Sequence, residues 1–137
     1  MIHECTVKVR AFETDGLGHV SNISYFIYLE EARIELFREL GASLEMGEWE
    51  FILASTSCDF KQQAYFDEKL TVETSVEKIG NSSFHLYHEV VNDRGIIATG
   101  KAAIVHFDFH TQRASALPIE MRAKLEQFME TTKVKER

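Results

Sequence analysis

The chain has 137 residues, of which 45% are hydrophobic and 27% charged, and this size and composition suit one ordinary hydrophobic core. Its formal charge of −7 argues against nucleic acid as a partner, because phosphate groups require clustered Lys and Arg. The only cysteines, Cys5 and Cys58, form no Cys-x-x-Cys motif, so we expect no disulfide framework and no zinc site. No stretch approaches the roughly 20 apolar residues of a membrane span, and the start lacks a signal-peptide pattern. We therefore expect a single cytoplasmic domain over residues 1–137.

The first predicted elements are a strand and a long helix. Polar and apolar residues alternate over residues 6–12, which predicts a half-buried strand. Asp15 follows the end of this strand, in a turn that contains Gly16 and Gly18. Over residues 22–40 the apolar positions recur every three or four residues, which predicts an amphipathic helix. Asp15 is therefore expected just before the start of the helix.

Strand patterns dominate the rest of the chain. Four runs are rich in β-branched and aromatic residues, at residues 51–66, 70–79, 83–92 and 95–109. The turns between them are short enough for antiparallel hairpins, so we expect a four-stranded meander. A second helix is expected after Pro118, with Met121 and Leu125 on its apolar face, and residues 131–137 are expected to fray. The predicted fold class is α+β, a five-stranded antiparallel sheet whose one face is covered by the long helix.

Residues 13–33 carry a dense motif, Glu-Thr-Asp-x-x-Gly-His-Val-x-Asn-x-x-Tyr-Phe-x-Tyr-x-Glu-x-Ala-Arg. This segment resembles the opening signature of hotdog-fold acyl-CoA thioesterases of the 4-hydroxybenzoyl-CoA thioesterase-like group. The similarity continues over residues 58–70, 79–84, 98–100 and 105–108. The resemblance implies a hotdog fold, in which a five-stranded antiparallel sheet wraps around a long central helix and a C-terminal helix follows.

The resemblance also implies an activity and a site. It implies hydrolysis of thioesters of coenzyme A or acyl carrier protein, without metal or other cofactor, by a homo-oligomer that is a dimer or tetramer. The family's acidic catalytic residue maps onto Asp15, and its carbonyl-polarising amide maps onto the backbone N–H of Asn22. In this family the site usually lies between two subunits. Some relatives have a tyrosine where this chain has Ala11 and a histidine where it has Asn22, so the roles of those side chains do not transfer.

The residue types fit this chemistry, because a thioester carbonyl is already electrophilic. Hydrolysis needs an oriented nucleophile and a place for negative charge on the carbonyl oxygen. Asp15 can attack to form an anhydride or act as general base on a water, and the first N–H groups of the helix can stabilise the oxyanion. The structural alternative is that Asp15 only caps the turn at Gly16. His19 can contact substrate, orient Asp15, or pack as a turn residue.

Further site candidates follow from position and charge. Gly18 and Tyr25 are candidate substrate-binding residues, and Lys61 and Lys101, with Arg94, are candidate cations for the coenzyme's phosphates, although a lysine on a solvated face is the alternative. A metal site is not expected among the histidines, since the odd separation of His85 and His88 in a strand points them to opposite faces.

Other functions compete with hydrolysis. A hotdog hydratase or dehydratase would use a different Asp-His constellation on a motif that this chain lacks. A non-catalytic protein that binds acyl thioesters or small metabolites would keep the same scaffold, but binding alone does not demand the Asp15 to Asn22 segment. A purely structural oligomer subunit has no feature in its favour. Acyl chain length and aromatic preference stay open, because an apolar tunnel and an ordinary core use the same residue types.

Overall fold

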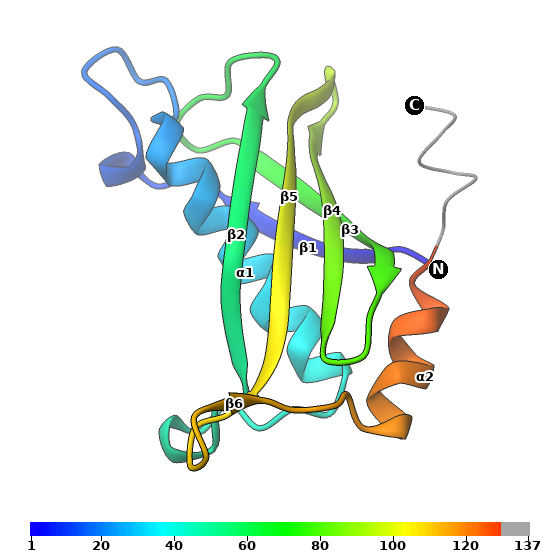
Figure 1. The fold of residues 1–137 in the computed structure, drawn as a ribbon. Coiled ribbons are helices and arrows are strands. Elements are labelled where there is room, and N and C mark those ends of the chain that lie inside the picture. Colours follow the sequence, from blue (N-terminus) through cyan, green and yellow to red (C-terminus); the bar gives the residue numbers. More distant parts are fainter. Residues whose placement is uncertain (130–137) are drawn as a thin grey trace.

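A curved antiparallel sheet wraps around one long helix (Figure 1), in a computed structural model that describes residues 1–129. The tail expected to fray, residues 131–137, lies outside the described residues. The helices are α1 (Asn22–Glu39) and α2 (Ile119–Gln127). The strands are β1 (His3–Lys8), β2 (Phe51–Phe60), β3 (Lys69–Ile79), β4 (Ser83–Asn92), β5 (Gly95–Asp108) and the short β6 (Arg113–Ala114). No helix within residues 1–129 is both long and apolar enough to cross a membrane.

The strand order is β1-β3-β4-β5-β2, with β6 paired to β5 beyond the five main strands. The five expected strands and both helices are confirmed, but the predicted meander is wrong at its first step. Two strands separate β2 from β3, because β2 pairs with β5 and residues 61–68 then cross to the other side of the sheet. The N–H groups of Lys61 and Gln62 both donate to the carbonyl of Ile97, at 2.8 and 3.0 Å, so the chain leaves β5 at this point.

Two strand boundaries also differ from the predictions. The first strand ends at Lys8 instead of residue 12, because Ala11–Glu13 forms a 3-10 turn. The strand predicted over residues 51–66 ends at Phe60, where the crossing segment begins. Both shifts place irregular backbone near Asp15.

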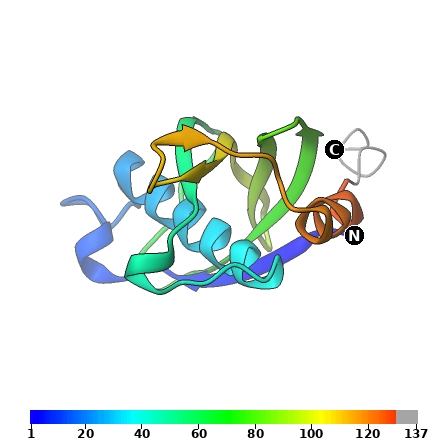
Figure 2. The same ribbon diagram turned by 60° about the horizontal axis from the view of Figure 1, so that its bottom comes forward.

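The helix α1 lies within the curve of the sheet and supplies much of the core. Figure 2 shows α1 inside the curve of the sheet, with α2 beside the start of β1. The fully buried side chains on α1 are Tyr28, Leu29, Ala32 and Leu36. Leu29 packs against Gly100 so closely that a Cβ on Gly100 would lie 2.6 Å from Leu29 Cδ1 and 3.1 Å from the carbonyl oxygen of Ser57. A side chain at Gly100 would therefore separate the helix from the sheet.

One polar row crosses the face of the sheet that α1 covers. His3, Thr74 and His88 are paired in register on β1, β3 and β4, and Gly100 continues the row on β5. Thr74 Oγ1 lies 2.8 Å from His88 Nδ1, and both side chains are fully buried. Burial, together with the nearby Arg33 and His3, lowers the pKa of His88 to about 3, so the imidazole stays neutral in the core.

The contact at Gly100 predicts a packing defect. We expect Gly100→Ala to destabilise the protein by about 1–3 kcal/mol, because the added methyl group overpacks the junction of α1 with the sheet. Gly47→Ala is the matched control, since nothing lies within 4 Å of a Cβ there. Urea unfolding of the two variants measures the difference, and equal stabilities would contradict the packing described.

The buried His88 predicts a pH dependence of stability. The pKa of His88 is near 6.5 in the unfolded chain and about 3 in the native protein, so between these values only the unfolded state takes up the proton. The free energy of unfolding should therefore fall as the pH drops below 6.5, by up to about 1.4 kcal/mol per pH unit from this residue. In denaturant unfolding from pH 7 to 4, His88→Gln should show a shallower fall than wild type. Parallel pH profiles would rule out this contribution.

Candidate active site

The segment before α1 is fastened by the buried carboxylate of Glu13, which is 2% exposed. Its Oε1 accepts from the N–H of Arg10 and the hydroxyl of Tyr28, each at 2.9 Å. Its Oε2 accepts from Arg10 Nε at 2.8 Å and from the Arg10 Nη2 group. The backbone carbonyl of Glu13 accepts from Ser21 N–H at 3.0 Å and Ser24 Oγ at 2.8 Å. Glu13 thus joins the end of the first strand to the start of α1.

Electrostatics favour the charged form of Glu13 in spite of its burial. Burial by itself raises the pKa of this carboxyl, but the hydrogen bonds from Arg10 and Tyr28 outweigh it and hold the pKa below its usual value. The same surroundings raise the pKa of Tyr28, through burial first and then the bond to Glu13. Sequence reasoning treated Glu13 only as part of a motif. The spacing of Arg10 and Glu13, three residues apart, was the available signal of an ion pair.

Asp15 lies in a small hairpin loop that the bridge between Thr14 and Val20 closes. Asp15 Oδ1 accepts from the N–H groups of Leu17 and His19, at 2.8 and 3.1 Å. Asp15 Oδ2 lies 4.0 Å from His19 Nδ1, and the Asp15 side chain is 47% exposed. One oxygen therefore orders the loop, as the structural alternative expects, while the other faces His19 and solvent.

The backbone of this loop turns at Gly18. The N–H of Asp15 donates to the carbonyl of His19 at 2.8 Å, and Gly18 N–H donates to the carbonyl of Asp15 at 3.1 Å. Gly18 has a φ of +80°, in the left-handed region that a side chain disfavours. The glycine thus allows the turn that brings the Asp15 carboxylate back toward His19.

Open hydrogen-bond donors lie at the start of α1. Ser21 is the N-cap residue, but its side chain caps no helix N–H and instead lies 2.9 Å from Ser24 Oγ. Ser24 N–H donates to the carbonyl of Ser21 at 3.0 Å. No hydrogen bond within residues 1–129 uses the N–H of Asn22 or Ile23, and both residues are exposed. These two amides form the positive end of an 18-residue helix.

The segment after β2 forms a second wall of the site. Val20 N–H donates to the carbonyl of Ala64 at 2.9 Å, and Phe66 N–H donates to the carbonyl of Gly18 at 3.1 Å. The rings of His19 and Tyr65 meet edge to face, with centroids 5.3 Å apart. Figure 1 shows the two loops together at one end of the molecule, the first in blue and the second in green.

The candidate substrate-binding residues Lys61, Tyr25 and Lys101 lie at different distances from the Asp15 loop. Lys61 is exposed at the start of the segment that contacts the Asp15 loop. Tyr25 is 2% exposed, its ring packs 5.4 Å from that of Phe60, and burial raises its pKa to about 12. Lys101 lies on the face of the sheet away from α1, 4.0 Å from Glu77 Oε2. The structure thus brings Asp15, Gly18, His19, Asn22 and Lys61 to one end of the protein, with Tyr25 beneath them and Lys101 on the opposite face of the sheet.

The histidine pair follows the predicted alternation. His88 is buried beneath α1, whereas His85 lies in a hollow on the other face with Ser57 and Lys101. Arg94, the third candidate cation, is bonded to Glu68 by two nitrogens at 2.8 and 3.0 Å. Its guanidinium is thereby committed within the protein.

Comparison with known proteins shows the family to which this chain belongs. The family model described as thioesterase-like superfamily matches residues 9–125. The chain is 37% identical over 82 residues to the uncharacterized protein YsmA of Bacillus subtilis, a match that covers 60% of this chain and 56% of that protein. It is 27% identical over 127 residues to the long-chain acyl-CoA thioesterase FadM of Escherichia coli, covering 90% and 96% of the two chains.

The fold is also similar to that of a solved structure. A predicted thioesterase from Bacillus stearothermophilus superposes with a TM-score of 0.88 at 29% identity, over 94% of this chain and 97% of that one. The match over residues 9–125 includes the Asp15 loop, α1 and the main strands β2 to β5, and it begins just after the end of β1. The chain therefore belongs to the thioesterase-like superfamily and has the hotdog fold of these enzymes.

Proposed function

We propose that the protein hydrolyses acyl-CoA thioesters to the free acid and the thiol, with Asp15 as the catalytic carboxylate. One observation carries the proposal: a single closed loop holds Asp15 Oδ2 uncommitted, and the helix that follows begins with two open amides, those of Asn22 and Ile23. A carboxylate and oxyanion donors are the two groups that thioester hydrolysis requires. The acyl-CoA substrate of the relative FadM supports coenzyme A as the carrier. Acyl carrier protein is the alternative carrier.

The proposed chemistry divides between the two groups. The carbonyl oxygen of the thioester would accept hydrogen bonds from the Asn22 amide, where the helix dipole stabilises the developing negative charge. Asp15 Oδ2 would remove a proton from the attacking water, and the thiolate would leave as the C–S bond breaks and take up that proton. Alternatively, Asp15 Oδ2 would attack the carbonyl itself and expel the thiolate to form an anhydride, which water then cleaves to the free acid and the Asp15 carboxylate. His19, whose Nδ1 lies 4.0 Å from Asp15 Oδ2, would orient this carboxylate or contact the substrate. Gly18, Tyr25 and Lys61 would shape the binding side of the same loop cluster.

We also propose that the functional unit is a homodimer that pairs through β2. This strand pairs only with β5 among the described strands, so its other edge is open. Leu53 and Phe60 face the α1 side of the sheet, yet each is 43% exposed. Ile23 and Ile27 on α1 are 74% and 42% exposed. An open strand edge beside apolar side chains favours pairing with a second copy.

Two-fold pairing of β2 would complete the site. Helix α1 begins near the end of β2, where Tyr25 meets Phe60, and ends near its start, where Phe37 stacks on Phe51 at 4.3 Å. Antiparallel β2 strands would therefore place the start of one α1 beside the start of the other subunit's β2. There, a cavity of about 160 Å³ lies between α1 and the sheet, lined in part by Phe37, Trp49 and Phe51. Glu30 and Arg33 also line this cavity, and its apolar part is our candidate for the acyl group.

Replacing the catalytic carboxylate tests the proposed activity. We expect Asp15→Asn to lower kcat by about 10²–10⁴-fold, because the amide cannot act as a base or form the anhydride. The amide oxygen can still accept from Leu17 and His19, so the fold should persist. Thiol release is measured over aliphatic and aromatic acyl-CoA substrates and acyl carrier protein thioesters. Glu120→Gln, an exposed carboxylate on α2, is the control.

Two outcomes contradict this assignment. Comparable hydrolysis by Asp15→Asn would exclude Asp15 from the chemistry. Saturable binding of acyl-CoA by the wild type, without hydrolysis at any chain length, would favour a binding protein on the same scaffold.

The dimer is tested at the middle of β2. Thr56 is exposed on the α1-facing side of the strand, so two-fold pairing would place two copies of any charge there side by side. We expect Thr56→Lys to shift the sedimentation profile toward the monomer and to lower kcat/KM, whereas Thr111→Lys, in an exposed turn, should change neither. A wild-type protein that sediments as a monomer would refute the proposed dimer.

A further inference from the structure

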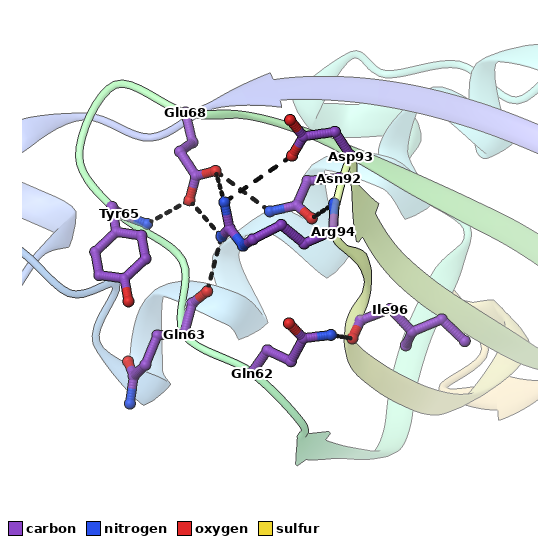
Figure 3. A network of polar contacts seen from close by, with 8 residues as sticks. All are labelled: Gln62, Gln63, Tyr65, Glu68, Asn92, Asp93, Arg94 and Ile96. Carbon is purple, nitrogen blue, oxygen red and sulfur yellow. Dashed lines mark hydrogen bonds and ion pairs between the residues drawn. The ribbon is translucent and has the colours of Figure 1, made fainter.

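A polar network fastens residues 61–68 to the turn between β4 and β5 (Figure 3). Arg94 Nη1 donates to Glu68 Oε2 at 2.8 Å, and Arg94 Nη2 donates to Glu68 Oε1 at 3.0 Å. The same Nη2 donates to the carbonyl of Gln63 at 3.0 Å. Asn92 donates to Glu68 Oε2 at 3.3 Å, and its own Oδ1 accepts from Arg94 N–H at 2.8 Å. The guanidinium thus binds residues 61–68 at two points, the carbonyl of Gln63 and the carboxylate of Glu68.

Glu68 also binds the backbone of Tyr65. Its Oε1 accepts from the N–H of Tyr65 at 2.8 Å, the contact that a dashed line marks in Figure 3. The Arg94 guanidinium carbon also lies 5.5 Å from the centroid of the Tyr65 ring. Gln62 adds a separate contact, from its Nε2 to the carbonyl of Ile96 at 3.0 Å. Tyr65 is therefore held by its backbone through Glu68 and by its ring through Arg94.

The part of the chain held in this way is the part that contacts the Asp15 loop. On either side of Tyr65, the carbonyl of Ala64 accepts from the N–H of Val20, and the N–H of Phe66 donates to the carbonyl of Gly18. The Tyr65 ring packs against His19, the residue whose N–H binds Asp15 Oδ1. A continuous set of contacts therefore runs from Arg94 through Glu68 and Tyr65 to the carboxylate of Asp15.

The Arg94–Glu68 pair is more tightly fixed and less exposed than an ordinary surface ion pair. An exposed salt bridge contributes little to stability, but a bidentate arginine fixes both distance and direction. The Glu68 side chain is only 20% exposed, and its two oxygens accept four hydrogen bonds from Arg94, Tyr65 and Asn92. These bonds, chiefly those from Arg94, hold the pKa of Glu68 below its usual value. Lysine cannot reproduce the fork that reaches Glu68 and Gln63 together.

We propose that Arg94 and Glu68 are positioning residues for thioester hydrolysis, which hold Asp15 and the start of α1 in register through the Tyr65 segment. The expected effect on kcat rests on the proposed function. The expected ordering of the Asp15 loop rests on the contacts alone. Neither residue touches the reacting atoms in this role. Their effect is on the placement of the carboxylate, and small displacements of a catalytic group are costly to rate.

Kinetics and hydrogen exchange together test the inference on the full chain. We expect Arg94→Ala to lower kcat about tenfold with little change in KM, because misplacement affects chemistry more than binding. Arg94→Lys should recover part of the loss, since it keeps a cation beside Glu68. Adding Glu68→Gln to Arg94→Ala should lower kcat little further, because the first substitution already removes the contact between the two residues. In Arg94→Ala, the amides of Leu17, His19 and Val20 should exchange faster.

The control is Lys8→Ala, which removes a different ion pair to the same segment. Lys8 Nζ lies 3.0 Å from Asp67 Oδ1, and both side chains are more than 60% exposed. Because Asp67 has no part in the contacts to His19 or Val20, we expect this variant to keep the wild-type kcat and exchange rates. A loss equal to that of Arg94→Ala would show a general effect of loop stability and overturn the proposal.

Three further results would overturn the proposal, and they are separable from failure of the proposed function. An Arg94→Ala variant with unchanged kcat would exclude a positioning role. A rise in KM alone would make Arg94 a substrate ligand instead. Unchanged exchange of Leu17, His19 and Val20 would break the structural link. If the wild type hydrolyses no thioester, the proposed function fails, while accelerated exchange in Arg94→Ala would still support the positioning of the loop.

Discussion

The buried carboxylate of Glu13 is the interaction on which the geometry of the site depends. A buried charge without partners is strongly unfavourable, so the residues that satisfy it are constrained in turn. Here the partners are Arg10 before the loop and Tyr28 in the second turn of α1. The carbonyl of Glu13 adds the N-cap residue Ser21. The loop that carries Asp15 is thereby closed at both ends before any substrate contact is considered.

The crossing of the chain after β2 supplies the second half of the site. Because β2 pairs with β5 at the open edge of the sheet, residues 61–68 must travel to β3, and they pass over the Asp15 loop on the way. A hairpin at this point would have left the start of α1 without the contacts from Ala64 and Tyr65. The crossing also leaves one edge of β2 free. Strand order therefore governs the surroundings of Asp15 and the proposed dimer interface together.

Much of the fold could be predicted, because its signals are local. The spacing of apolar residues predicts α1, and the alternation in β3 to β5 is interrupted by turn residues at the observed positions. The predictions failed where pairing between distant segments decided the outcome. The turn residues at 66–69 indicate where β3 begins, but they do not indicate which strands pair with β3. Likewise, the Arg10 and Glu13 contacts replace the end of the first predicted strand with a 3-10 turn.

The sequence by itself determined that an acidic residue, a glycine turn and a helix start follow one another in the Asp15 to Asn22 segment, because these features depend on backbone preferences over a few residues. Only the tertiary structure decided which distant groups join that segment. Lys61 and Lys101 were equivalent candidates until strand register placed one at the end that holds Asp15 and the other on the opposite face. Arg94 was a third such cation, and it is instead bound to Glu68, 26 residues away. Pairings at such separations depend on strand order, which local patterns do not encode.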